Sequence, residues 1–280
     1  MSGLTNDMFR ILRDIIHDMT GILYDESKTY LLENRILRRL SDVGLESFDE
    51  YLDIIHNLDA HPQEKEAFID LVTTHETSFF RNAPQLDIFI NDALPQILVE
   101  AERKGAGEVK IWSAGCSTGE EPYNIAMMME MSSVVPQNLK VRVLGTDISM
   151  LSIKTAKNGL FDSYSLRNAP YEYLHRFFTK VDDKKFMISS SVANSVEFCQ
   201  LNLLDEEGMC KMSKMDIIVC RNVLIYFDLD VRNKVAKLLH RSLRDGGLLF
   251  IGHSESFSDL SEMFTLETRK GIPVYRKKSM

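Results

Sequence analysis

A segment rich in glycine, hydroxyl and carboxyl groups, residues 113–122, follows a short apolar run with the alternation of a strand. A glycine-bearing turn between a first strand and its helix is where open parallel sheets bind nucleotides, because glycine lets a ligand approach the backbone. Gly115 and Gly119 fit that role, although such a pair is as often an ordinary tight turn. The full G-x-G-x-x-G pattern is missing, so a bound pyrophosphate is not predicted. Two carboxylates, Glu120 and Glu121, would repel a pyrophosphate but suit a cationic sulfonium or amine.

An aspartate ends the next predicted strand, residues 141–147. Asp147 lies 32 residues beyond Gly115, and a carboxylate at the tip of this strand can accept hydrogen bonds from both ribose hydroxyls of an adenosine. The alternative is that Asp147 caps the following helix, which is predicted to open at Ser149. Further along, Asn202 could read the adenine edge while Leu203 packs on its face. With an antiparallel final strand, this pattern favours S-adenosylmethionine over NAD.

The elements that must position these residues fall into two groups, of which the first is helical. Apolar residues recur at helical spacing through the first hundred residues, with stops at Gly21 and Gly44. Ser27 is expected to cap the second helix. Shorter helices are predicted at residues 48–55 and 68–72. A further helix is expected from Pro84 to about residue 104.

Strands alternate with helices from residue 108 onward. Strands are predicted at residues 109–112, 141–147, 216–220 and 248–252, the last after a turn at residues 245–247, with a terminal hairpin formed by residues 264–266 and 274–276. This alternation predicts a parallel sheet covered on both faces. Between residues 160 and 201 the pattern breaks into a helix near 171–178 and strand-like pieces at 186–189 and 196–199. We interpret that stretch as an insertion on the sheet.

Composition excludes several classes of protein. The 280 residues carry 33 Lys+Arg against 41 Asp+Glu, a net charge of -8, which argues against a nucleic-acid binder over the whole surface but not against a local basic patch. The four cysteines show neither a metal-site nor a disulfide spacing, so no metal is predicted and a reduced cytoplasmic setting fits best. Apolar runs are too short for membrane insertion, and the N-terminus lacks the pattern of a signal peptide.

Four long motifs in order resemble the chemotaxis receptor glutamate methyltransferases, the CheR family. They are TTHETSFFR at 73–81, WSAGCSTGEEPY at 112–123, CRNVLIYFD at 220–228 and GGLLFIGHSESF at 246–257. The resemblance implies an α/β protein: an all-helical N-terminal domain over residues 1–80, then a Rossmann-like S-adenosylmethionine-dependent methyltransferase domain over residues 81–280. It also implies a small inserted β-subdomain at about residues 160–200, in agreement with the break in the pattern.

The resemblance also implies a set of site residues. S-adenosylmethionine would be bound by His75, Thr77, Arg81, Glu121, Asp147, Asn202, Leu203, Arg221 and Asn222. The family usually has Asn where this chain has His75, which keeps a donor and an acceptor; the alternative is a histidine on a helix surface. Of the paired carboxylates, the resemblance favours Glu121 as the ligand and leaves Glu120 as a capping residue.

The implied reaction transfers a methyl group from the sulfonium to the carboxylate of a receptor glutamate, giving a methyl ester and S-adenosylhomocysteine. A glutamate with a pKa of about 4.3 is already ionised at neutral pH, so no general base is needed. Catalysis would rest on positioning and desolvation. The candidate catalytic residues are Arg81, which can hold a carboxylate of the cofactor or of the substrate, and Tyr226, whose hydroxyl could orient the substrate oxygen. The alternative for Tyr226 is a half-buried core aromatic.

The implied partner is the cytoplasmic helical bundle of chemotaxis receptors. A basic cluster on the second predicted helix is the candidate docking patch for the acidic methylation region, with a solvated face as the alternative: Lys28, Arg35, Arg38 and Arg39. Some members of the family bind a receptor's C-terminal pentapeptide through a glycine-containing loop of the β-subdomain. The loop here, TKVDDKK at 179–185, has no glycine, which predicts a form that acts without this tether. A monomer is expected.

Other functions remain open at this point. A methyltransferase of the same fold could act on small molecules or RNA, which the helical domain and the acidic balance disfavour. A silent module could instead sense S-adenosylmethionine or scaffold a signalling array, although a silent relative would be free to lose Arg81, Glu121, Asp147, Asn222 or Tyr226. An NAD-dependent oxidoreductase is disfavoured by the missing glycine pattern.

Overall fold

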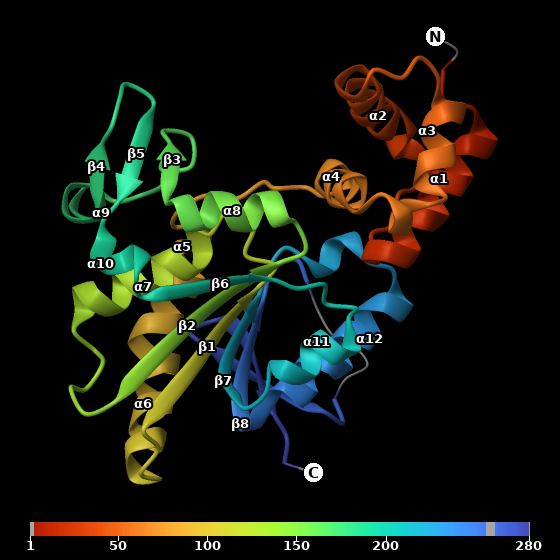
Figure 1. Ribbon diagram of the computed structural model, residues 1–280. Coiled ribbons are helices and arrows are strands. Elements are labelled where there is room, and N and C mark those ends of the chain that lie inside the picture. Colours follow the sequence, from red (N-terminus) through yellow and green to blue (C-terminus); the bar gives the residue numbers. More distant parts are fainter. Residues whose placement is uncertain (1–2, 256–260, 280) are drawn as a thin grey trace.

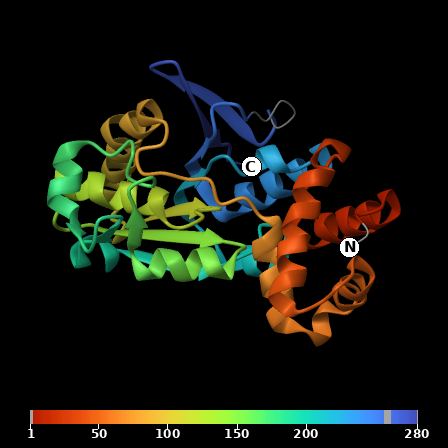
Figure 2. The ribbon, with the colours of Figure 1, turned by 90° about the horizontal axis from the view of Figure 1, so that it is seen from above.

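The computed structural model describes residues 3–255 and 261–279, and its N-terminal region is helical (Figure 1). The helices are α1 (Asn6–Thr20), α2 (Thr29–Val43), α3 (Phe48–Ile55) and α4 (Pro62–Val72), with 3-10 turns η1 (Glu26–Lys28) and η2 (Leu58–Ala60). Their apolar faces bury a core that is distinct from the two cores on either side of the sheet. Figure 2 shows these helices beside one end of the sheet.

The ends of these helices follow local chemistry. Helix α1 ends at Gly21 and α2 ends at Gly44, both in the left-handed conformation, so both predicted stops are confirmed. The prediction that Ser27 caps α2 is wrong. Asp25 caps the turn η1 instead by accepting the N–H of Ser27 at 2.9 Å, and α2 begins only after that turn. The Ser27 hydroxyl also donates to the Asp25 carboxylate, so this side chain is held within the turn and does not cap α2.

The single helix predicted after Pro84 has three parts. Helix α5 (Ala83–Ile88) runs into a π-helical turn, η3 (Phe89–Ala93), and then into α6 (Leu94–Arg103). Pro95 lies in the first turn of α6, and a proline has no N–H to donate to the preceding turn. A locally wider turn accommodates that missing bond without ending the helix.

A seven-stranded sheet forms the second region, in the order β6-β2-β1-β7-β8-β10-β9. Five strands are parallel, and β10 and β9 form an antiparallel hairpin at one edge. The strands are β1 (Glu108–Ala114), β2 (Lys140–Asp147), β6 (Val196–Gln200), β7 (Met215–Cys220), β8 (Leu243–Ile251), β9 (Phe264–Arg269) and β10 (Ile272–Lys277). The predicted strand and helix alternation and the terminal hairpin are confirmed.

Helices cover both faces of this sheet. Alternate residues of β1 point to opposite sides, so Ile111 joins a core with α6 and α7 (Glu120–Ser132), whereas Trp112 joins a core with α12 (Leu229–Ser242). Helix α8 (Met150–Asn158) packs on the first face, and α11 (Glu206–Lys211) on the second. Strand β1 lies between β2 and β7, so the strand order reverses there, which is where open α/β sheets bind ligands.

A separate small sheet follows α8, in the order β3-β5-β4. It contains β3 (Leu160–Asp162), β4 (Phe178–Lys180) and β5 (Lys185–Ile188), with helices α9 (Tyr171–Phe177) and α10 (Ser190–Ala193) beside it. The strand predicted at 196–199 does not belong to this insertion. It is β6, which pairs in parallel with β2 at the edge of the main sheet. A short strand carries no local signal of which sheet it will join.

The turn predicted at residues 245–247 is also wrong. Strand β8 continues through it with a register shift against β7, so the two glycines form an irregularity inside a strand. A Cβ on Gly247 would meet the carbonyl oxygen of Arg244 at 2.9 Å, a close backbone approach that glycine permits in a strand. Of the fourth motif singled out above, residues 256 and 257 lie outside the described residues.

Candidate functional site

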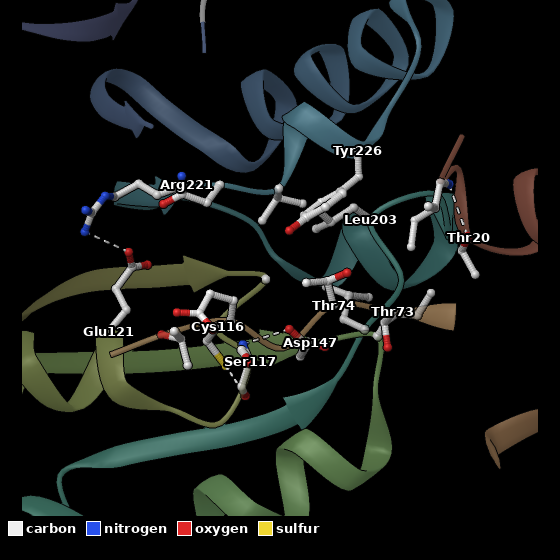
Figure 3. Close-up of a pocket in the computed structure, with 18 of the residues that line it drawn as sticks. Thr20, Thr73, Thr74, Cys116, Ser117, Glu121, Asp147, Leu203, Arg221 and Tyr226 are labelled. Carbon is white, nitrogen blue, oxygen red and sulfur yellow. Dashed lines mark hydrogen bonds and ion pairs between the residues drawn. The ribbon is translucent and has the colours of Figure 1, made fainter. Parts of the chain in front are cut away.

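A cavity lies at the carboxyl ends of β1, β2 and β7, where the strand order reverses (Figure 3). Its walls come from both regions of the chain. The residues that line it are Thr20, Ile22, Thr73, Thr74, Glu76, Thr77, Ser78, Arg81, Gly115, Cys116, Ser117, Glu121, Asn124, Asp147, Ile148, Leu201, Asn202, Leu203, Arg221, Asn222, Val223, Tyr226 and Phe227.

The turn after β1 forms the floor of the cavity. Gly115 has a φ of 75°, and a Cβ there would meet Cγ2 of Val223 at 2.4 Å. Gly119 has a φ of 96° and would meet the Cβ of Ala156 at 2.8 Å. Both positions therefore require glycine for conformation and for space. Gly115 lines the cavity and Gly119 does not, and the close approaches at both positions are to protein side chains. The two glycines therefore serve the packing of the turn.

The two neighbouring glutamates point to different places. Glu121 lines the cavity, accepts a hydrogen bond from Ser113 at 2.7 Å and pairs with Arg221 at 3.1 Å. Glu120 is buried away from the cavity and accepts a bond from Thr118 at 2.7 Å, while Gly119 occupies the N-cap position of α7. Burial raises the pKa of Glu121 above the ordinary range, although Arg221 opposes that shift.

Asp147 ends β2 at the opposite side of the floor. Its carboxylate accepts the N–H of Ser117 at 2.8 Å and the N–H of Ser149 at 3.0 Å. The alternative that Asp147 caps α8 is wrong, because Ser149 is the N-cap and accepts the N–H of Ser152. Burial raises the pKa of Asp147, and the two backbone donors oppose the shift. A carboxylate has about four acceptor sites, so two remain for a ligand.

The segment at residues 73–81 connects the helical domain to the sheet domain and forms a side wall. Thr77 and Arg81 both line the cavity. The guanidinium of Arg81 donates to the carbonyl oxygen of Glu76 at 2.7 Å, which fixes one end of it and leaves other donors of the guanidinium available. Arg167 pairs with the Glu76 carboxylate at 2.9 Å. The wall is therefore tied to the loop that follows β3.

Of the residues that the resemblance assigns to the cofactor, His75 alone does not line the cavity. Its Nδ1 lies 2.9 Å from the Ser152 hydroxyl and its Nε2 lies 3.0 Å from the Thr73 hydroxyl. The ring therefore points into the contact with α8, while its carbonyl oxygen lies 3.4 Å from the hydroxyl of Ser117. In this arrangement His75 holds the side wall against the floor.

The loop after β7 supplies the opposite wall. Arg221 is 8% exposed and donates to the carbonyl oxygen of Arg81 at 2.7 Å as well as to Glu121. Asn222 adopts a φ of 59°, an uncommon left-handed conformation that asparagine tolerates better than most residues. Figure 3 shows the ring of Tyr226 reaching into the cavity with its hydroxyl, while the ring also packs on the core beside α12. Tyr226 is thus both a cavity residue and a half-buried aromatic.

The end of α1 seals the remaining side, which no local sequence pattern predicted. Thr20 and Ile22 line the cavity. Four contacts join this part of the chain to the sheet domain: Leu23 N–H to the Tyr226 carbonyl at 2.9 Å, the bridge between Ile22 and Phe227, His17 to Asp228 at 2.7 Å, and the Asn202 amide to the Met19 carbonyl at 2.8 Å. Asn202 therefore lines the cavity beside Leu203 while its amide holds α1.

Two polar atoms near the cavity have no hydrogen-bond partner within the described residues. Oδ1 of Asn124 is an acceptor, and Nε of Arg221 is a donor. Buried polar atoms are seldom left unpaired without a reason. A ligand with both an ammonium and a carboxylate, such as the amino-acid part of S-adenosylmethionine, matches this pair. The half-buried carboxylates of Glu121 and Asp147, which both line the cavity, suit its net positive charge.

The predicted basic cluster lies away from this cavity, and its members differ in their partners. Arg35, Arg38 and Arg39 belong to α2, whereas Lys28 ends the preceding turn η1. Arg39 pairs with Glu64, with Nε at 2.9 Å and Nη2 at 2.5 Å. Arg35 donates to the Tyr24 hydroxyl at 2.7 Å, and Lys28 lies 3.5 Å from Asp25. Arg38 is exposed, and no ion pair or hydrogen bond involves its side chain in the part of the chain that the structure describes.

Sequence comparisons identify both regions. The family described as "CheR methyltransferase, SAM binding domain" matches residues 75–272, and "CheR methyltransferase, all-alpha domain" matches residues 7–73. The chain is 33% identical to chemotaxis protein methyltransferase 2 of Vibrio cholerae over 98% of this chain and 94% of that protein. It is 34% identical to the chemotaxis protein methyltransferase of Escherichia coli over 98% and 91% of the two chains.

Comparison with solved structures returns more distant proteins. Magnesium protoporphyrin IX methyltransferase (ChlM) from Synechocystis PCC 6803 with bound SAM is 14% identical, with a TM-score of 0.35 over 71% of this chain and 85% of that chain. That likeness is too weak to carry an argument. The two family matches meet next to the cavity wall and together span most of the sequence. The chain, an all-helical domain followed by an S-adenosylmethionine-binding methyltransferase domain, belongs to the CheR family of chemotaxis methyltransferases.

Proposed function

We propose that this protein methylates glutamate side chains of chemotaxis receptors with S-adenosylmethionine, forming glutamyl methyl esters. The observation that carries the proposal is the cavity itself. It combines half-buried carboxylates that suit a cationic cofactor with an arginine and a tyrosine, Arg81 and Tyr226, on walls built by different parts of the chain. The match to chemotaxis methyltransferases supports the same class of substrate.

The cofactor contacts that we propose follow the chemistry of each residue. Asp147 accepts hydrogen bonds from the ribose hydroxyls, and Asn202 and Leu203 hold the adenine. Glu121 and Arg221 face the amino-acid end together with Asn222 and Thr77. His75 contributes indirectly by fixing the side wall through Ser152 and Thr73. When bound, S-adenosylmethionine supplies an electrophilic methyl group on a sulfonium.

In the proposed reaction the substrate carboxylate oxygen forms a bond to the methyl carbon as the S–CH3 bond breaks, and the bonding pair stays on sulfur. No proton moves, because the glutamate is already ionised. The chain therefore acts by positioning the oxygen and excluding water. Tyr226 orients the oxygen through its hydroxyl. Arg81 holds a carboxylate at the mouth of the cavity, and one end of its guanidinium is already fixed by the Glu76 carbonyl.

Receptor docking is proposed for the basic face of α2. Arg38 is the best placed of the four residues because it is exposed and uncommitted among the described residues, and Lys28 makes only a long contact of 3.5 Å to Asp25. Arg35 and Arg39 already have partners in the helical domain. A receptor segment rich in carboxylates would be steered toward this face by its charge.

Independence from a C-terminal receptor pentapeptide is part of the same proposal. The loop between β4 and β5 carries no glycine, and the Asp182 carboxylate accepts the N–H groups of Lys184 and Lys185 at 2.7 and 2.8 Å. The loop is thus closed by its own side chain. Receptor variants with and without the terminal pentapeptide should be methylated at equal rates, and a large loss on truncation would contradict this part.

One experiment tests the proposal as a whole. The protein is incubated with radiolabelled S-adenosylmethionine and receptor-containing membranes, and the receptor band is examined for label that is released by base. We expect base-labile label, because methyl esters hydrolyse readily and methylated amines do not. Cofactor binding without label in any receptor would instead favour a silent sensing module, and label in a small molecule or RNA would favour the other methyltransferase classes.

A further inference from the structure

A buried carboxylate outside the cavity touches the loop that carries the proposed catalytic tyrosine. Glu255 follows the end of β8, is 8% exposed and does not line the cavity. It lies in the fourth sequence motif, residues 246–257. None of the cofactor or substrate contacts proposed above involves a residue of that motif. Its charge contributes to raising the pKa of Glu121 and of Cys220, after burial, so it is close to the floor of the site.

Both oxygens of Glu255 accept backbone N–H groups from the loop after β7. Oε2 accepts from Asn222 at 3.0 Å and Oε1 accepts from Ile225 at 3.2 Å. Oε2 also accepts from Gly252 at 2.5 Å, at the end of β8. One side chain therefore fixes both ends of the turn from residue 222 to residue 225, immediately before Tyr226, and ties that turn to the neighbouring strand.

The end of β8 is shaped to admit this carboxylate. A Cβ on Gly252 would meet Oε2 of Glu255 at 2.6 Å and the backbone nitrogen of Asn222 at 3.2 Å. A side chain at position 252 would therefore displace the carboxylate from the loop. The N–H of Glu255 in turn donates to the Gly252 carbonyl at 3.0 Å, which closes a tight turn around the contact.

The contact depends on a group that only accepts hydrogen bonds. Glu255 forms no ion pair within the described residues, and its three bonds all come from backbone donors. A glutamine of the same shape offers one acceptor oxygen and one NH2 group. The NH2 group would face one of these N–H donors and leave it unpaired, which releases that part of the loop from the carboxyl group.

We propose that Glu255 is a positioning residue that holds Asn222 and Tyr226 in place for methyl transfer. It acts on the reaction through the backbone of the loop and does not touch the substrate. The inference rests on the function proposed above, because it gives Tyr226 a role in turnover. It adds a separate claim about what fixes the conformation of that loop, including the left-handed backbone of Asn222.

The first test is a double-mutant cycle with Glu255→Gln and Tyr226→Phe, measured as kcat for receptor methylation. Alone, Glu255→Gln should lower kcat by about tenfold to a hundredfold, the effect of losing a positioning hydrogen bond. In the Tyr226→Phe background the same change should cost less than about threefold, because residues that act as a unit are not additive. Full multiplication of the two effects would overturn the proposal, since it would mean an independent structural loss.

The second test needs no receptor. Hydrogen exchange of the Asn222 and Ile225 amides should become at least about tenfold faster in Glu255→Gln, while the amides of β1 keep their rates. Glu267→Gln, which removes a carboxylate from the terminal hairpin, is the matched control and should leave both amides unchanged. If Glu255→Gln does not fold, Glu255→Asp keeps the charge but shortens the reach and should accelerate the same two amides. Unchanged exchange at these two amides would overturn the proposal.

The two readouts separate the two possible failures. If no receptor is methylated by the unaltered protein, the proposed function fails, and the exchange rates still decide whether Glu255 fixes the loop. If receptors are methylated and Glu255→Gln keeps full activity, the function stands and the positioning role fails.

Discussion

The cavity has two kinds of wall, and they are built differently. The wall at the strand ends is held by polar groups with at least two hydrogen bonds each. Asp147 accepts two backbone N–H groups, and the buried Arg221 donates to Glu121 and to the Arg81 carbonyl. At the junction of the two domains the side chains are held more loosely: within the described residues the Arg81 guanidinium donates one hydrogen bond, to the Glu76 carbonyl, and the Ile22 side chain makes apolar contacts while its backbone bridges to Phe227.

This difference indicates that the two walls serve different functions. Groups that several hydrogen bonds hold in place are preorganised, which favours tight and specific binding of a compact ligand. Groups at a domain junction can adjust when a large partner arrives. We therefore expect changes in the strand-end wall to alter cofactor affinity, and changes in the junction wall to alter turnover with the receptor.

The largest effect is expected for Arg81→Ala. Removing a guanidinium from a carboxylate that it holds by two charge-assisted hydrogen bonds should lower kcat/KM for the receptor by about a hundredfold to a thousandfold. Calorimetry with S-adenosylhomocysteine then measures whether the variant keeps its affinity for the cofactor. An unchanged affinity assigns Arg81 to the substrate carboxylate and to the junction wall. An affinity that falls by the same factor assigns it to the cofactor, and the division between the walls would then fail at this residue.

Tyr226→Phe should give the next largest effect. Turnover should fall by about tenfold to a hundredfold, the size of a lost hydrogen bond in the transition state, while cofactor affinity changes little because the ring remains in place. Initial rates of receptor methylation and a binding isotherm measure the two quantities. Full activity of the variant would remove the proposed role of the hydroxyl.

The strand-end wall makes a prediction about pH. Burial raises the pKa of Asp147 and of Glu121, so each takes up a proton at a higher pH than an ordinary carboxyl group as the solution is acidified. Protonation removes negative charge that a cationic cofactor would meet, so affinity for S-adenosylmethionine should fall as pH is lowered toward the acidic range, by about threefold to tenfold. Asp147→Asn should bind more weakly at neutral pH and show a flatter profile. An affinity that is independent of pH in the unaltered protein would count against charged carboxylates at the cofactor.

The smallest effects are expected on α2, where two neighbouring arginines form a matched pair. Arg38→Glu should slow receptor methylation severalfold at low ionic strength, by about threefold to tenfold, with the difference shrinking as salt screens the charges. Arg39→Gln should instead lower the free energy of unfolding by about 1–3 kcal/mol, because it leaves the mostly buried Glu64 with Tyr51 as its remaining side-chain partner. If Arg39→Gln slowed methylation as much as Arg38→Glu without loss of stability, the assignment of the two residues would be reversed.

Local chemistry made much of this molecule predictable. Gly21, Gly44 and the turn after β1 are determined by backbone conformation, and Asp147 is found by its distance from the first glycine turn. What the sequence did not predict depends on pairing between distant segments. Thr20 and Ile22 reach the cavity only because α1 packs on the loop before α12, and no pattern in the first helix indicates that.

The same limit explains the other differences. The local pattern predicts that residues 196–199 belong to the insertion, whereas they form β6. The partner strand β2 lies about fifty residues earlier, and a local pattern holds no information about such a distant pairing. The orientation of the His75 ring is fixed by Ser152, which belongs to α8, 77 residues further along the chain. Arg39 looks like part of a charged surface until α4 brings Glu64 beside it.

The seal formed by α1 has a consequence for how such proteins can diverge. The two family matches divide at residue 74, so the boundary between the domains runs along a wall of the cavity. A helical domain exchanged from a relative would replace the docking face proposed on α2, but it would also replace Thr20, Ile22 and the contact of Leu23 with the Tyr226 backbone. An exchange of the helical domain would therefore alter the cavity, and with it the rate of methyl transfer, as well as the docking face. A chimera would need compensating substitutions along the loop before α12 to recover that rate.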